Sequence, residues 1–233
     1  MHTQVQTPQE IFTLPQHLTV PLFQRPYVWT EEDQLGPLWQ DIRRVTDLRM
    51  TSSPNAVHFL GAVVLQQQLG GMGAVSAFAV IDGQQRLTTL QVLMDATAAV
   101  LESLEKSSLA QQLFALTHNA THFGLDEDQL LKVQHTNRDR DAFHEVMNAE
   151  PPIDYDELEA SSSLITRGHA FFATQVRDWL TEESDAVSGR RAEELVAVLS
   201  ARTPTSDHHP SARRGLPGDI RDAECAGDPT HRS

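Results

Sequence analysis

The sequence has very little lysine, one cysteine and no long apolar run, and each deficit narrows the range of functions. Lysine occurs only at Lys106 and Lys132, and the 233-residue chain has a formal net charge of −14 at pH 7. A broad, non-specific grip on DNA needs clustered Lys and Arg that neutralise phosphates, so any DNA contact is expected to be local. The length and the 39% apolar composition suit one large domain or two small ones.

The scarcity of cysteine and of long apolar segments also bears on the cellular compartment. Cys225 is the single cysteine, so no disulfide can form within one chain, which fits a reducing compartment. Segment 1–10 is polar and lacks the charged and apolar regions of a signal peptide. A membrane-spanning helix needs about 20 apolar residues, and no run approaches that length. We therefore expect a cytoplasmic protein with no membrane partner.

The most informative segment is an apolar run that stops at Asp82-Gly83 and restarts as an amphipathic helical pattern from Leu87. Glycine lets the backbone turn sharply and approach a ligand, and the unpaired N–H groups of the following helix favour an anion. Arg86 lies at the start of that helix, where its guanidinium can bind phosphate in a bidentate manner. The pattern predicts a phosphate site. The alternative is an ordinary turn in which Asp82 caps the helix and Arg86 is solvated.

A second Gln-Arg pair, Gln24-Arg25, stands between a short apolar run and the aromatic residues Tyr27 and Trp29. Two Gln-Arg pairs at strand edges can converge on one ligand. Tyr27 either stacks on a nucleotide base or packs, whereas packing is favoured for Trp29. The glycine-rich segment 67–76 is not followed by Lys-Ser or Lys-Thr, so it is interpreted as a flexible connection and not as a Walker-type loop.

The remaining pattern predicts short strands first and helices afterwards. Strands are expected over 11–14, 18–23, 59–66 and 77–81, with the last two forming a hairpin. Helical spacing predicts helices over 31–50, capped by Thr30, then from 87 with a continuation or restart over 109–116, then over 138–148, 161–181 and 190–200. Segment 201–233 has almost no apolar periodicity, and its His208-His209 pair is interpreted as solvated and not as a metal site.

Three blocks of sequence carry a family resemblance: FQRPYVW at 23–29, HFLGAVVL at 58–65 and DGQQRLTTL at 82–90. Their order and spacing resemble the N-terminal domain of GmrSD-type restriction endonucleases from residue 10 to about residue 180, with NRDRDAF at 137–143 as the helical continuation. The resemblance implies a fold like that of ParB and sulfiredoxin, in which a Gly-x-x-Arg turn holds nucleotide phosphates. It also implies nucleotide-dependent defence against foreign, often modified, DNA.

The expected fold class is α+β. A small ParB-like mixed sheet with helices is expected over residues 1–90, a mostly helical domain over 91–200, and a disordered or aberrant tail over 201–233. Members of the family usually continue with more helices and often a C-terminal nuclease of the His-Asn-His type, and neither is recognisable after Ser200. The tail is expected to be either divergent or the product of a truncated or frame-shifted reading.

The expected ligand is a nucleoside triphosphate of unknown base together with Mg²⁺. The residues expected to bind it are Gln24, Arg25, Tyr27, Asp82, Gly83 and Arg86. The residues expected to act in hydrolysis are Asp82, Gln84, Gln85 and Arg86. In this mechanism the arginines neutralise phosphate charge, Asp82 holds magnesium through water, and one of the two glutamines orients the attacking water. Thr88 and Thr89 are left out of the site, because threonine is common in the first turn of a helix.

The expected macromolecular partner is foreign or modified DNA, reached through a nuclease domain or a partner chain, and a homo-oligomer is compatible with the sequence. Two other functions stay open. The chain can be a non-enzymatic sensor of nucleotide or DNA that signals to a separate nuclease. It can also be a ParB-like, metal-dependent nuclease, although no compact group of Asp, Glu and His accompanies the Arg86 turn.

Overall fold

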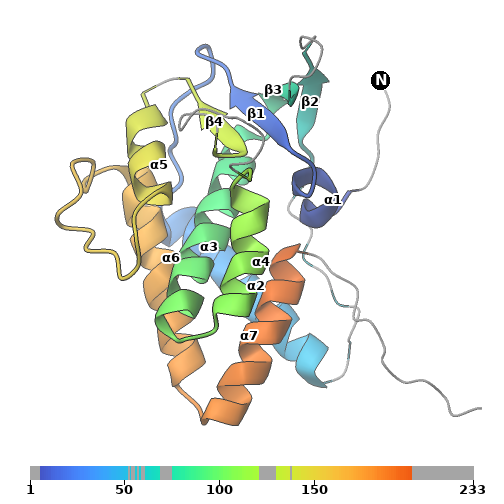
Figure 1. The fold of residues 1–233 in the computed structure, drawn as a ribbon, viewed down its shortest axis with the longest axis vertical. Coiled ribbons are helices and arrows are strands. Elements are labelled where there is room, and N and C mark those ends of the chain that lie inside the picture. The colour runs from blue at the N-terminus through green and yellow to red at the C-terminus, as the bar shows by residue number, and fades with distance from the viewer. Residues whose placement is uncertain are drawn as a thin grey trace, which may run out of the picture.

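The computed structural model describes residues 6–51, 53, 56, 58, 61–68, 75–120, 130–136 and 138–200. Within these ranges the chain forms an α+β fold, in which a small mixed sheet lies at one end of a group of helices (Figure 1). This arrangement confirms the expected fold class. The prediction for the tail, 201–233, lies outside the described residues.

The sheet has the strand order β2-β3-β1-β4. Strand β1 (Gln16–Val20) is parallel to both of its neighbours, β3 (Ser76–Asp82) and β4 (Val133–His135). Strand β2 (Val64–Gln67) pairs antiparallel with β3, which confirms the predicted hairpin. Because β1 and β3 are parallel, their carboxyl ends lie at the same edge of the sheet. The segments that follow these two strands, each with a Gln-Arg pair, therefore meet there.

The N-terminal segment departs from the prediction. The strand expected over 11–14 is wrong, because Pro8–Phe12 forms helix α1. The Thr7 hydroxyl accepts a hydrogen bond from the backbone N of Glu10, and the Glu10 carboxylate accepts one from the backbone N of Thr7. This capping box, with proline at the first helical position, starts a helix where the short apolar run alone indicated a strand. The next predicted strand is found as β1, displaced toward the N-terminus.

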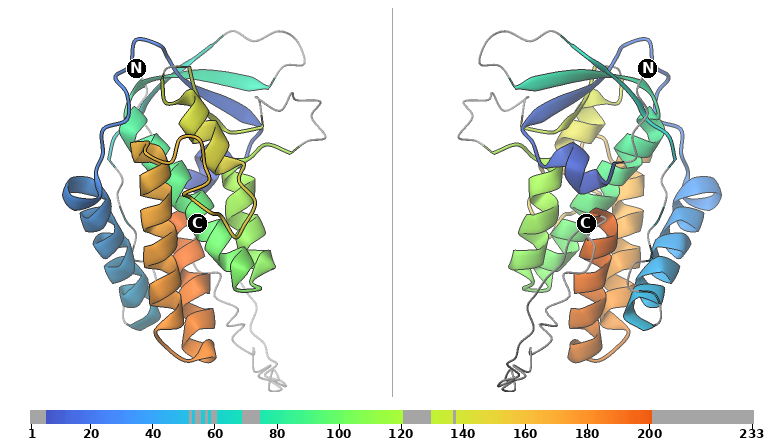
Figure 2. Two further views of the ribbon diagram at one scale, coloured as in Figure 1. Left: turned by 90° about the vertical axis from the view of Figure 1, so that its left-hand side faces the viewer. Right: turned by 90° about the vertical axis from the view of Figure 1, so that its right-hand side faces the viewer.

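The helices run side by side beneath the sheet, with α2 on the outer side against α7 (Figure 2). Their bounds are η1 (Glu31–Leu35), α2 (Gly36–Thr51), α3 (Gln84–Ser103), α4 (Ser107–Thr117), α5 (Arg140–Met147), α6 (Leu164–Thr181) and α7 (Asp185–Ser200). Each predicted helix is present. Thr30 caps the π-helical turn η1, since its side chain accepts a hydrogen bond from the backbone N of Asp33. None of the helices in the described ranges is long and apolar enough to cross a membrane.

Helix α3 is the centre of the fold and packs mainly against α4 and α6. Its residues are buried almost without interruption from Gln84 to Leu101. One hydrophobic cluster joins Leu18 and Val80 of the sheet to Val92 of α3 and Trp179 of α6. The division expected at residue 90 thus falls inside a helix that belongs to this shared core.

Candidate functional site

Gly83 connects β3 to α3 in a backbone conformation that requires glycine. Its φ is +89°, in the left-handed region. A Cβ atom at this position would lie 2.9 Å from Cγ2 of Val63 and 3.1 Å from the backbone O of Ala62. Any side chain would therefore be both strained and too close to the segment before β2. The close contact observed at Gly83 is made to Ala62 and Val63, and the expected approach of its backbone to a ligand stays a prediction.

The start of α3 has no side-chain cap. Gly83 is the N-cap residue, no side chain of the described residues caps the helix, and its first turn contains no acidic residue. The first N–H groups of an α-helix have no partner within the helix, and the aligned peptide dipoles make this end partly positive. Because α3 leaves this end without a capping oxygen or a carboxylate, it is suited to an anion.

Arg86 lies in the first turn of α3 and is half-buried. Its Nη1 atom donates a hydrogen bond to the backbone O of Ala62 at 2.9 Å. Gly61 has a φ of +102°, and a Cβ there would lie 3.1 Å from Nε of Arg86. Glycine at 61 therefore leaves room for the guanidinium, and Ala62 fixes its position. Gly61 and Ala62 were not predicted as site residues, although they belong to the HFLGAVVL block that supports the family resemblance.

Two glutamines join the loop that contains Arg25 to the end of β3 and the start of α3. Nε2 of Gln24 donates to the backbone O of Ile81 at 2.9 Å. Nε2 of Gln84 donates to the backbone O of Arg25, also at 2.9 Å. The Arg25 side chain is exposed, and its backbone is thus tied to the first residue of α3. The structure therefore brings the two Gln-Arg pairs together, as expected.

Gln84 and Gln85 differ in their remaining hydrogen-bonding capacity. For Gln85, Oε1 accepts from the backbone N of Val28 at 3.0 Å and Nε2 donates to the backbone O of Pro26 at 3.1 Å. For Gln84, Oε1 is buried without a hydrogen-bond partner among the described residues. A buried unpaired acceptor costs about 1–3 kcal/mol. Gln84 therefore has an acceptor available for a hydroxyl, an amino group or a water, while both ends of the Gln85 amide hold the loop.

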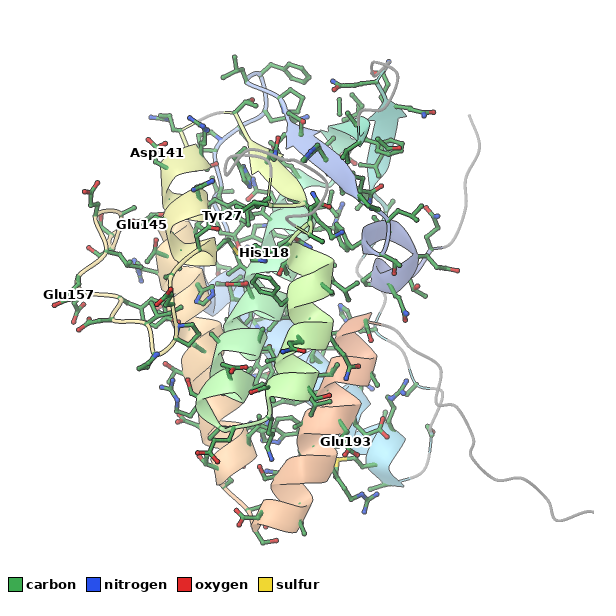
Figure 3. The ribbon with its side chains drawn as sticks, viewed as in Figure 1. Tyr27, His118, Asp141, Glu145, Glu157 and Glu193 are labelled. Carbon is green, nitrogen blue, oxygen red and sulfur yellow. The ribbon has the colours of Figure 1, made fainter. Side chains whose placement is uncertain are left out.

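Tyr27 packs into the core and is 6% exposed (Figure 3). Its phenol oxygen lies 2.6 Å from Oγ1 of Thr89. The Thr89 hydroxyl donates to the backbone O of Gln85, so the phenol is the donor in its contact with Thr89. The backbone N of Tyr27 donates to Oδ2 of Asp139 at 2.7 Å. Burial raises the pKa of the Tyr27 phenol, which keeps it protonated. In this arrangement Tyr27 fastens the loop to α3, and its ring faces core residues.

Asp82 is the last residue of β3 and its side chain is exposed. In the described part of the chain, no group of three or more His, Cys, Asp or Glu residues could hold a metal ion. Mg²⁺ is commonly bound by one or two carboxylates together with substrate phosphates and water. A single carboxylate such as Asp82 would therefore fit Mg²⁺ only together with a phosphate-bearing ligand.

Comparison with known families agrees with the resemblance carried by the three sequence blocks. The chain matches the family described as the GmrSD restriction endonuclease, N-terminal domain, over residues 9–201. The match covers more than half of the chain and includes every residue of the expected site. The chain therefore belongs to the family of GmrSD restriction endonuclease N-terminal domains. No curated protein matches the chain.

Proposed function

We propose that the chain is the nucleotide-binding module of a GmrSD-type restriction system and that the start of α3 binds the phosphates of a nucleoside triphosphate. The observation that supports this most strongly is the uncapped start of a 20-residue helix next to Arg86. The chain has a net charge of −14, so attraction of a polyanion must be local. Arg86, the exposed Arg25 and the N–H groups in the first turn of the helix, which has no side-chain cap among the described residues, supply that local attraction.

The bound nucleotide uses the neighbouring residues in distinct roles. Arg86 neutralises charge on the terminal phosphates, and Asp82 would hold Mg²⁺ through water, which would supply further neutralisation of phosphate charge. Oε1 of Gln84 accepts a hydrogen bond from a ribose hydroxyl, from a base amino group or from the attacking water. If hydrolysis takes place, Gln84 orients the water and the arginines stabilise the developing charge. The nucleotide state then controls a nuclease that acts on foreign or modified DNA.

Calorimetric titration of the full chain with ATP, GTP and CTP, each with Mg²⁺, tests the proposal. Arg86→Gln is the informative variant, and Arg190→Gln, which removes the same charge from an exposed position on α7, is its control. We expect saturable binding of one nucleotide, weakened about 10- to 150-fold by Arg86→Gln, because a charge-assisted contact is worth about 1.5–3 kcal/mol. Binding should be unchanged by Arg190→Gln. Equal effects of the two variants, or no binding by a folded sample, would remove the nucleotide function.

Binding without turnover is the second candidate function. The observation in its favour is that both ends of the Gln85 amide are engaged by the loop, which leaves only Gln84 of the two glutamines with an unused acceptor. A sensor needs the phosphate site but no water-positioning group. Phosphate release measured with the bound nucleotide in excess distinguishes the two functions. Multiple turnovers support the hydrolase, and binding with no release supports the sensor.

A further inference from the structure

A second concave site lies between β4 and α5. Its cavity has a volume of about 440 Å³. The polar residues that line it are Gln134, His135, Thr136, Arg140 and His144. None of the described residues lining it is Asp or Glu, although Asp and Glu together outnumber Lys and Arg by 32 to 18 in the sequence. Among the described lining residues the charge is therefore neutral or positive, which suits an anion better than a cation.

His135 is the group that points to a ligand. It is 5% exposed and its ring packs against Phe143, with the ring centroids 4.7 Å apart. Its Nε2 atom lies 3.1 Å from Oγ1 of Thr88 on α3. The other ring nitrogen, Nδ1, is buried with no hydrogen-bond partner among the residues that the structure describes. A buried nitrogen of this kind is costly unless water or a ligand completes its hydrogen bonding.

The protonation state of His135 decides what the unpartnered nitrogen can bind. Burial lowers the pKa of His135 to about 4, so the ring is neutral at pH 7 and only one nitrogen is protonated. When the Thr88 hydroxyl donates to Nε2, the proton of the ring is on Nδ1. The ring then carries a buried, unused N–H donor on a residue that lines the cavity, and an oxygen of an anion is a suitable acceptor for it.

Arg140 supplies the positive charge. It is exposed at the first position of α5, while His144 lies one turn further along the same helix, half-buried. A guanidinium has five N–H donors, so it can bind an oxyanion in a bidentate manner in addition to another contact. Asp141, next to Arg140 in the sequence, is not among the residues that line the cavity and lies at the top of α5 in Figure 3.

We propose that the cavity between β4 and α5 binds a small organic oxyanion, a phosphate ester or a carboxylate, through Nδ1–H of His135 and the guanidinium of Arg140. The volume is in the range typical of small-molecule sites. The site shares no residue with the phosphate site at the start of α3. The proposal for this cavity therefore does not depend on the proposed nucleotide function.

Long-range ¹H–¹⁵N correlation spectra of histidine rings in the ¹⁵N-labelled full chain test the proposal, with inorganic phosphate and acetate as probes. His135→Phe, which keeps a ring against Phe143, assigns the His135 signals. We expect Nδ1 of His135 to be the protonated nitrogen and to shift saturably with one of the probes. Arg140→Gln should weaken that response about tenfold, as expected for loss of a charge-assisted hydrogen bond. The response to each probe distinguishes a phosphate ester from a carboxylate.

Arg138→Gln is the matched control. It removes the same charge two residues before Arg140, and Arg138 is not among the residues that line this cavity. It should leave the apparent affinity within a factor of two. Arg86→Gln should also leave the His135 response intact, since it alters only the other phosphate site. Protonation of Nε2 instead of Nδ1, no saturable shift with either probe, equal loss in Arg138→Gln, or loss of the response in Arg86→Gln would each overturn the proposal.

Discussion

The starts of α3 and α6 show two different ways to complete the N-terminus of a helix. Helix α6 is capped from within, because Oγ of Ser163 accepts a hydrogen bond from the backbone N of Ile165 at 3.1 Å. Helix α3 starts at a glycine with no cap, and distant segments hold it instead. Arg86 contacts Ala62, and Gln85 contacts the loop at Val28. The start of α6 is capped by a side chain of its own segment, whereas the start of α3 is positioned by distant segments and has no side-chain cap among the described residues.

The largest loss of stability is expected at Gly83, the glycine at which α3 starts. Gly83→Ala should destabilise the protein by roughly 2–5 kcal/mol, because it adds left-handed strain to an overpacked contact with Val63. Gly189→Ala in α7 is the control, since nothing lies within 4 Å of a Cβ there. The control should gain about 0.5–1 kcal/mol from its helical position. Urea unfolding measures both changes. Similar free energies of unfolding for the two variants would contradict the claim that the turn at position 83 requires glycine.

The burial of His135 makes the stability of the protein depend on pH. The folded-state pKa of about 4 lies below the ordinary value of 6.5, so the unfolded chain binds more protons between these values. The contribution of His135 is therefore complete above pH 6.5 and is lost as the pH falls toward 4, amounting to about 3 kcal/mol. Unfolding free energies measured across this window should fall less steeply in His135→Phe than in the parent protein. Equal slopes would show that His135 is not the group responsible.

The two adjacent glutamines allow a sharper test of how the loop is held. Gln85→Met should destabilise the protein by roughly 2 kcal/mol, because it leaves the backbone groups of Val28 and Pro26 without their partners. Gln84→Met loses one bond to Arg25 and also removes a buried unpaired acceptor, so its net effect should be near zero. Thermal unfolding of the pair gives the comparison. A larger loss in Gln84→Met would mean that its Oε1 already has a partner.

A smaller loss than in Gln85→Met is expected at the self-capped helix α6. Ser163→Ala should cost about 1 kcal/mol, the usual value for loss of a side-chain cap. The change is local, so nucleotide affinity should stay the same. Chemical denaturation and the calorimetric titration measure the two quantities. A loss of nucleotide affinity in Ser163→Ala would show that the two helix starts are not independent.

The contrast between local and distant contacts also explains how much could be predicted from the sequence. Thr30 as a cap, the β2–β3 hairpin, the helices and the meeting of the two Gln-Arg pairs depend on local patterns and strand direction, and they are confirmed. The α1 capping box was also present locally, at Thr7 and Glu10, but the apolar residues that follow were interpreted as a strand. The capping box indicated a helix and the apolar residues indicated a strand, and the structure has the helix.

Other features could not be predicted, because they depend on pairs far apart in the chain. Strand β4 has three residues and is defined by its pairing with β1, not by a long apolar run of its own. The engagement of both ends of the Gln85 amide depends on residues 57 and 59 positions away. The burial of Tyr27 depends on Thr89, 62 positions along the chain. Residue type indicated that these side chains were important, but not what each would contact.

Backbone amide NMR tests the central claim most directly, because it compares the two helix starts in one experiment. The ¹⁵N-labelled full chain is titrated with the nucleotide that binds in the presence of Mg²⁺. We predict that the amide signals of Gln84, Gln85 and Arg86 shift saturably, while those of Leu164 and Ile165 at the start of α6 stay in place. If the amides at the start of α3 do not respond, or respond no more than those of α6, the start of α3 is not the phosphate site.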